Sequence, residues 1–297
     1  MSLLSVCHTT VYRYHRPVTF GEHRLMFRPR DSHDIRLVDT ALTISPAAEI
    51  RWMHDVFSNS ITIASFQEAA SELRFESRIV IDHYGLSYPD FPIEPYAQTY
   101  PFSYPAEDIA DLGRSVERHY PDPERKVDAW VKRFLDNGGP VGTQDLLQRI
   151  NTAVQAEFGY ERRYAFGVQT PVETLERGSG TCRDLALFMM GAVRALGFAA
   201  RFVSGYLYDP ATETGGVADT SLKGGGDTHA WVQVYLPGAG WVEFDPTNGQ
   251  VGGANLIRVA VAREPFQALP LQGSYYGAAE DFVEMTVDVE VTKPEEG

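Results

Sequence analysis

The chain has 297 residues, of which 43% are hydrophobic and 22% charged, and its formal net charge is −14. This length and composition are typical of one large or two ordinary globular domains and argue against a disordered chain. The strong negative charge repels phosphate backbones, so we expect no nucleic-acid partner. No apolar run reaches the ~18 residues of a membrane span, and residues 1–14 lack a signal-peptide pattern. We expect no membrane association and a reducing, cytoplasmic location.

Two cysteines, Cys7 and Cys182, lie in very different sequence contexts. The chain has no CxxC motif, and its histidines show no His-x-His or His-x-x-x-His spacing. Neither a disulfide framework nor a zinc site is indicated. We therefore expect no metal and no cofactor. Cys7 lies in an apparent strand and is expected to be a buried apolar residue.

The first part of the chain, residues 1–100, is expected to form strands. Segments rich in β-branched and aromatic residues lie at 11–14, 36–44, 61–66 and 73–81, with partial alternation of apolar and polar positions. Proline and glycine interrupt them at short intervals, and no long amphipathic helix is evident. This pattern predicts a β-sandwich-like N-terminal domain.

A second part, residues 101–297, is expected to mix helices and strands. It follows a proline-rich and aromatic segment, 88–105, which we interpret as an extended linker that packs through its aromatic rings. Helical patterns lie at 106–119, 125–136, 143–158 and 182–196, and strand patterns at 198–208, 229–236, 241–245, 256–262 and 282–291. In 182–196 apolar residues recur at steps of three and four, and Gly197 ends the helix. The predicted fold class is α+β, with helices packed on an antiparallel sheet and C-terminal strands belonging to this second part.

Cys182 follows the tetrapeptide GSGT and begins the helix expected at 182–196. The positive end of the helix dipole favours the thiolate, which is the nucleophilic form of cysteine. Backbone N–H groups of the first turn have no partner within the helix and can donate to an oxyanion. A buried core cysteine is the alternative. Asp184 lies in the first turn, where we expect its carboxylate to stabilise the helix by ~0.3–1 kcal/mol rather than to take part in chemistry.

A cysteine nucleophile needs a base, and the base needs a group that orients it. His229 begins the strand expected at 229–236, Asp245 ends the strand at 241–245, and the residues PGAG between them indicate a hairpin. Side chains alternate between faces along a strand, so His229 and Asp245 share a face only if the loop has an odd number of residues or a bulge intervenes. We predict the odd number, with Trp231 on the His229 face. Trp231 either lines an acyl-binding groove or packs in the core.

The glycine-rich segment 209–228 ends directly at His229 and contains few large apolar residues. It cannot bury much surface, so we expect a mobile surface loop that acts as a lid over the site.

Four segments of the second part and the strand-rich first part resemble those of a known family. The segments GTCRD (180–184), FAARFVSGY (198–206), THAWVQVYL (228–236) and GWVEFDPTNG (240–249) look like those of the bacterial transglutaminase-like superfamily, and residues 1–100 resemble the β-domain that precedes this core in bacterial members. The resemblance implies a papain-like core with Cys182 as nucleophile, His229 as base and Asp245 as its orienting group. It does not identify a substrate, because the superfamily includes cross-linking enzymes, peptidases and amidases.

The leading hypothesis is an enzyme that acts on an amide, peptide or isopeptide bond of a protein or peptide through a Cys182 thioester. Water as acceptor gives a hydrolase and lysine gives a cross-link. Since transfer to an amine requires a site that excludes water, we favour hydrolysis. The alternative is a non-catalytic peptide-binding or scaffold module, and an acyltransferase with a thioester donor is a weaker third reading. The oligomeric state stays unknown at this stage.

Overall fold

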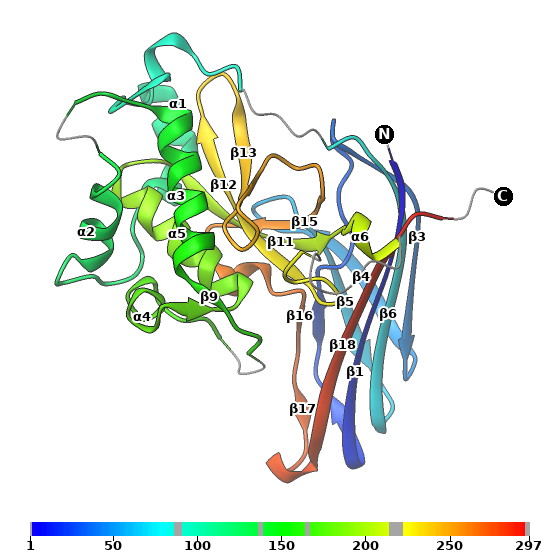
Figure 1. Ribbon diagram of the computed structural model, residues 1–297. Coiled ribbons are helices and arrows are strands. Elements are labelled where there is room, and N and C mark those ends of the chain that lie inside the picture. Colours follow the sequence, from blue (N-terminus) through cyan, green and yellow to red (C-terminus); the bar gives the residue numbers. More distant parts are fainter. Residues whose placement is uncertain (1, 86–90, 136–138, 164–166, 214–221, 295–297) are drawn as a thin grey trace.

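The computed structural model describes residues 2–85, 91–135, 139–163, 167–213 and 222–294. Figure 1 shows long strands on one side of the molecule, helices on the other, and a second set of strands between them. This arrangement of helices and sheets confirms the predicted α+β fold class.

The N-terminal part contains two antiparallel sheets that pack face to face. One sheet consists of β1 (Ser2–Phe20), β3 (Ile35–Ser45), β6 (Ala70–His83), β17 (Tyr275–Tyr276) and β18 (Phe282–Thr292), and the other of β2 (His23–Leu25), β4 (Ala48–His54), β5 (Ser60–Phe66) and β16 (Leu271–Gln272). Leu73 and Phe75 of β6 pack with Leu25 of β2 and Ala64 of β5 in one buried cluster. Alternating side chains of each strand thus fill the space between the sheets.

The four strands predicted for residues 1–100 lie within β1, β3, β5 and β6. Three further strands among the described residues up to 100, namely β2, β4 and β7 (Thr99–Tyr100), were not predicted. β2 and β7 have only three and two residues, too few for a pattern to be recognised, and β4 leaves six of its seven residues exposed. The half-buried position of Cys7 also differs from the expected full burial, because neighbouring residues of β1 alternate between the two faces of its sheet.

The C-terminal strands differ from their expected place in the second part of the chain. β18 pairs antiparallel with β1, where Ser5 lies opposite Thr292 and Val11 opposite Thr286, and β17 and β16 pair with β1 and β2. The alternation in 282–291 indicates a strand with one wet face, but it carries no information about the partner sheet. A division of the chain at residue 100 into independent domains stays a prediction.

The second part contains helices packed on an antiparallel sheet with strand order β14-β13-β12-β11-β15. Its strands are β11 (Ala200–Leu207), β12 (His229–Leu236), β13 (Gly240–Asp245), β14 (Gln250–Val251) and β15 (Leu256–Ala262), with short pairs β7 (Thr99–Tyr100) with β8 (Val141–Gly142) and β9 (Gly159–Tyr160) with β10 (Ser179–Gly180). Its helices are α1 (Ala106–Leu112), α2 (Lys126–Lys132), α3 (Thr143–Glu157), α4 (Pro171–Arg177), α5 (Cys182–Ala195) and α6 (Pro210–Glu213), and 3-10 turns are η1 (Pro95–Ala97), η2 (Gly113–Val116), η3 (Pro265–Ala268) and η4 (Ala279–Asp281).

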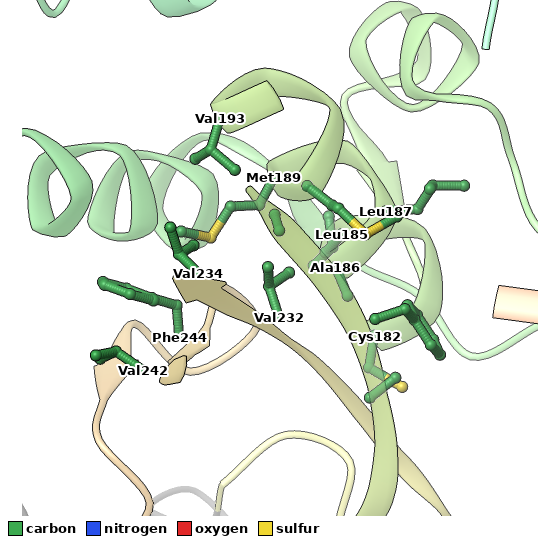
Figure 2. Close-up of a cluster of buried hydrophobic side chains, with 14 of the residues drawn as sticks. Cys182, Leu185, Ala186, Leu187, Met189, Val193, Val232, Val234, Val242 and Phe244 are labelled. Carbon is green, nitrogen blue, oxygen red and sulfur yellow. The ribbon is translucent and has the colours of Figure 1, made fainter. Parts of the chain in front are cut away.

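The helix α5 packs through its apolar stripe on one face of the core sheet. Figure 2 shows Met189 and Val193 beside Val232 and Val234 of β12, and all four side chains are fully buried. Burying each such side chain stabilises the fold by about 1.5–3 kcal/mol. The helix ends at the predicted place, where Gly197 adopts a φ of 89°.

The linker packs through its aromatic rings where the structure describes it; residues 88–90 lie outside the described residues. Tyr100 stacks on Phe198 with ring centroids 5.5 Å apart, and Phe102 contacts the same ring edge-on. The Tyr104 hydroxyl donates to the Tyr235 carbonyl and accepts from the Ala199 N–H. Within the described residues, no helix has the length and apolarity needed to cross a membrane.

Buried polar contacts join the two parts of the chain. His8 of β1 lies 3.0 Å from the Tyr206 hydroxyl of β11. His83 of β6 contacts the Leu256 carbonyl, and Asn59 bonds both the N–H and the carbonyl of Val261. The Tyr206 side chain therefore lies at the interface between the two parts, where its hydroxyl contacts His8.

Candidate active site

Cys182 is the first residue of α5 and is 7% exposed. The helix begins with a capping box, in which the Thr181 hydroxyl accepts from the Asp184 N–H and the Asp184 carboxylate accepts from the Thr181 N–H. These bonds leave the N–H groups of Cys182 and Arg183 without a helical partner. The nucleophile candidate therefore lies beside two backbone donors at the positive end of the helix.

Asp184 is fully buried and holds the start of α5 in place. The Arg163 guanidinium donates to both carboxylate oxygens, at 2.9 and 3.0 Å, and the Gln169 N–H donates at 2.7 Å. All of its polar contacts are with the helix start and the preceding segment. The structural role expected for Asp184 agrees with these contacts.

His229 and Asp245 form a hydrogen bond across the β12–β13 hairpin. Leu236 lies opposite Gly240 and Val232 opposite Phe244, so the loop has three residues and the predicted odd register is confirmed. The His229 Nε2–H donates to Asp245 Oδ2 at 2.9 Å, and both side chains are fully buried. The other ring nitrogen, Nδ1, has no hydrogen-bond partner at ordinary geometry among the described residues, which leaves it available to Cys182.

The electrostatics of this pair favour the charged forms of both residues. Burial on its own would lower the pKa of His229, but the charge and hydrogen bond of Asp245, followed by the contact with Cys182, raise that pKa to about 10. Burial would raise the pKa of Asp245, but His229, Asn248 and the Thr247 N–H hold it below its usual range. Both shifts favour the imidazolium–carboxylate form of the pair.

Part of the glycine-rich segment lies directly beside His229. Residues 214–221 are outside the described residues, and the lid prediction for them stays a prediction. Gly224 adopts a φ of 96°, and a Cβ there would lie 2.5 Å from His229 Nδ1, so a larger residue does not fit. Asn248 fixes this turn, because it bonds the N–H and the carbonyl of Lys223 at 2.8 and 3.1 Å. The same amide donates to Asp245 Oδ2 at 2.8 Å.

A second segment borders Cys182 on the other side. Tyr160 of β9 pairs with Gly180 of β10, and burial together with nearby Cys182 raises the pKa of the Tyr160 hydroxyl to about 12. Arg162 follows it and donates to the Gly225 carbonyl at 3.1 Å, with Asp227 3.6 Å away. The segment after β9 thus contacts the 222–228 turn, with Tyr160 near Cys182 and Gly224 near His229.

Trp231 lines no groove. Its side chain is fully buried, its ring lies 6.0 Å from that of His229, and its Nε1–H donates to the buried Glu243 carboxylate. Sequence reasoning did not identify Asn248 or Gly224 as parts of the site. Asn248 lies three residues after Asp245, a spacing at which an amide can bond back to a carboxylate. This spacing could have identified Asn248 from the sequence. In the described part of the chain, no group of three metal-ligating side chains comes together.

Family models match both parts of the chain. Residues 4–82 match the bacterial transglutaminase-like N-terminal region, and residues 128–246 match the core of the transglutaminase-like superfamily. By these matches, the chain combines a bacterial transglutaminase-like N-terminal region with a core of the transglutaminase-like superfamily. Cys182, His229 and Asp245 all lie within the matched transglutaminase-like core.

Relatives of this transglutaminase-like chain include proteins without a described activity. An uncharacterized protein of Mycobacterium tuberculosis H37Rv is 29% identical over 296 residues, which cover 96% of this chain and 91% of that protein. An uncharacterized protein of Mycobacterium leprae is 25% identical over 314 residues, covering 96% and 98%. The crystal structure of a candidate cysteine protease from Cytophaga hutchinsonii superposes with a TM-score of 0.68 at 16% identity, covering 100% of this chain and 93% of that one. The two chains therefore share their overall fold.

Proposed function

We propose that the protein is a cysteine hydrolase that cleaves an amide, peptide or isopeptide bond of a protein or peptide. Cys182 is the nucleophile, His229 the general acid and base, and Asp245 the group that orients and charges the imidazole. The buried hydrogen bond from His229 Nε2 to Asp245 carries this proposal, because it fixes the ring and leaves Nδ1 for the thiol.

In the first half of the reaction, the Cys182 thiolate attacks the carbonyl carbon of the substrate. The N–H groups of Cys182 and Arg183 donate to the oxyanion, and one such donor is typically worth about 3–4 kcal/mol in kcat. The His229 imidazolium transfers its Nδ1 proton to the leaving nitrogen. The C–N bond breaks, the amine departs, and a thioester on Cys182 remains.

In the second half, neutral His229 takes a proton from water at Nδ1, and the resulting hydroxide attacks the thioester carbonyl. The C–S bond breaks, the acid departs, and the thiolate and the imidazolium are restored. Transfer to an amine instead of water requires a site that binds the amine and excludes water. We favour hydrolysis, since water needs no dedicated binding site, whereas an amine acceptor does.

The test is a mass-spectrometric assay with glutamine-containing peptides and with protein substrates, each with and without a primary amine. The expected products are deamidated or cleaved peptides that disappear in Cys182→Ala and in His229→Ala. Amine-conjugated products without hydrolysis would replace the hydrolase by a cross-linking enzyme. If Cys182→Ala still forms both deamidated and cleaved peptides, Cys182 is not the nucleophile.

A non-catalytic peptide-binding module is the second candidate, and the 7% exposure of Cys182 favours it. The two candidates differ in thiol reactivity. In the hydrolase, iodoacetamide alkylates Cys182 faster than the half-buried Cys7, and His229→Ala removes the difference. Slower alkylation of Cys182 than of Cys7 would favour the binding module.

We also propose that the protein acts in a reducing compartment such as the cytoplasm, because both cysteines are free and a thiolate nucleophile must stay reduced. Alkylation of Cys182 in intact cells, before lysis, tests this location. A disulfide or mixed disulfide on Cys182 in freshly quenched cells would contradict it.

A further inference from the structure

A cavity of about 620 Å³ lies at the turn end of the β12–β13 hairpin, away from the triad. Its walls come from α1 and η2, from the turn after β4, and from the core sheet with the segment after β15. Tyr235 in its wall is six residues along β12 from His229, which corresponds to about 20 Å at the rise of a strand. The volume is typical of a ligand site, and the place where separate parts of a chain meet is a frequent location for one.

Arg201 is a wall residue whose guanidinium forms no ion pair within 4 Å among the described residues. Its guanidinium lies 4.1 Å from the centre of the Trp241 ring, and its Nε–H donates to Gln233 Oε1 at 2.6 Å. The two terminal nitrogens have no acceptor among the described residues. Burial lowers the pKa of Arg201 to about 10, since the attraction of Glu243 does not make up for the lost hydration.

Arg263 is a second wall residue with an unused donor. Its Nε is buried and has no acceptor among the described residues. Buried donors without an acceptor are rare in folded proteins, because each costs about 1–3 kcal/mol. Arg114 at the same cavity differs, since its Nε–H already donates to Glu117 at 2.7 Å. Two guanidinium groups with unused donors therefore line one cavity.

The other wall residues limit the kind of anion that fits. Asp108 and Asp111 of α1 also line the cavity, and neither forms an ion pair within the described part of the chain. These carboxylates and the net charge of −14 repel a polyphosphate or a nucleic acid. Trp241 and the turn residues Val56 and Phe57 offer apolar contact area, and Val56 is 90% exposed. The combination fits a single carboxylate on an otherwise neutral or basic apolar chain.

We propose that this cavity is an exosite that binds a carboxylate of a peptide, with Arg201 and Arg263 as its ligands and Trp241 as the surface for an adjoining apolar side chain. The carboxylate is either a C-terminal group or the side chain of an acidic residue, and both have the same recognition chemistry. The site binds its peptide without any contribution from Cys182.

The experiment is calorimetric titration of the full chain with three N-acetylated hexapeptides of the same length. One ends in a free phenylalanine carboxylate, one is its amide, and one is an amide with an internal glutamate next to phenylalanine. We expect binding of at least one carboxylate peptide, no binding of the plain amide, and weaker binding at higher salt. The two carboxylate peptides distinguish the C-terminal from the side-chain source.

Four variants locate the binding. Arg201→Gln and Arg263→Gln should each weaken it at least about tenfold, as expected for the loss of a charge-assisted hydrogen bond. Arg114→Gln is the matched control and should change it less than threefold, because Arg114 is paired. Asp111→Asn should tighten binding, and this gain cannot arise from misfolding.

The outcome must also be separated from binding at the thiol site. Cys182→Ala should bind the carboxylate peptides as tightly as the unmodified chain. Equal binding of the amide and acid peptides, binding that is insensitive to Arg201→Gln and Arg263→Gln in chains with unchanged circular dichroism, or no binding at millimolar peptide would each overturn the proposal. Loss of binding only in Cys182→Ala would assign the peptide to the triad instead.

Discussion

Replacing Asp245 by asparagine preserves the side-chain shape but removes the negative charge beside His229. The two residues are fully buried and 2.9 Å apart, so no solvent charge takes over the role of the carboxylate. Burial then dominates, and we expect the pKa of His229 to fall from about 10 to below its ordinary value of 6.5. The difference between the ordinary histidine pKa of 6.5 and the raised pKa of about 10 corresponds to on the order of 5 kcal/mol in favour of the imidazolium.

The expected consequence at pH 7 is a neutral imidazole, which can neither stabilise a thiolate nor protonate a leaving amine. Loss of the orienting carboxylate from a triad typically lowers kcat by about 10⁴. The assay combines the peptide hydrolysis rate with a ¹⁵N imidazole NMR titration of His229. Asp281→Asn is the matched control, because it removes a buried carboxylate that is paired with Arg16 of β1.

The pH dependence of stability gives a second readout of the same change. Because the folded-state pKa of His229 is raised, the stabilisation from its pair is complete below pH 6.5 and is lost as the pH rises through about 10. Urea unfolding should show this alkaline loss in the unmodified chain and not in Asp245→Asn. A His229 that titrates near 6.5 in the unmodified chain, or at the same pH in both chains, would refute the reasoning.

Three further predictions concern contacts around the site. Asn248→Ala should accelerate amide exchange in the 222–228 turn and slow hydrolysis about tenfold. The control Gln155→Ala removes a bond to the Asn248 carbonyl and should do neither. Unchanged exchange in Asn248→Ala would disprove that Asn248 holds this turn. Burial lowers the pKa of His8 to about 3 and so holds it neutral. Its contribution to the free energy of unfolding is complete above pH 6.5 and falls by about 1.4 kcal/mol per pH unit below that. In urea unfolding, His8→Gln should lose less stability between pH 7 and 5 than the unmodified chain, and an equal loss would exclude His8 as the cause. Arg163→Met leaves the buried Asp184 carboxylate without its ion pair and should lower the free energy of unfolding by about 3–5 kcal/mol, as measured with urea. Adding Asp184→Asn should restore part of this stability. A loss below 1 kcal/mol in Arg163→Met would contradict the prediction.

The sequence predicts those elements whose signal is local. The strands over 229–236 and 256–262 have the predicted bounds, because continuous apolar runs between turn residues identify a buried strand without knowledge of its neighbours. The hairpin register also follows from local information, namely the length of one turn. The place of β18 does not, since its partner β1 lies more than 250 residues away in the sequence and periodicity says nothing about strand partners.

The site divides in the same way. The position of Cys182 at a helix start and the places of His229 and Asp245 on one face of a hairpin could be derived from spacing. The bond between Arg163 and Asp184 could not, because it depends on how the chain between two elements folds back. The fit of the Gly224 backbone against the imidazole is likewise a result of tertiary packing.

The N-terminal part supports the back of the strand that presents His229. Glu243 is buried, burial raises its pKa, and it accepts hydrogen bonds from Trp231 and Gln233 of β12. Arg258 donates to Glu243 at 2.7 Å and to Asp34 at 3.0 Å, which extends the network into the N-terminal part. A buried carboxylate with this many donors is held in one geometry, and Trp231 stacks on the His229 ring. The N-terminal part is thus connected, through Arg258 and Glu243, to the strand that carries His229.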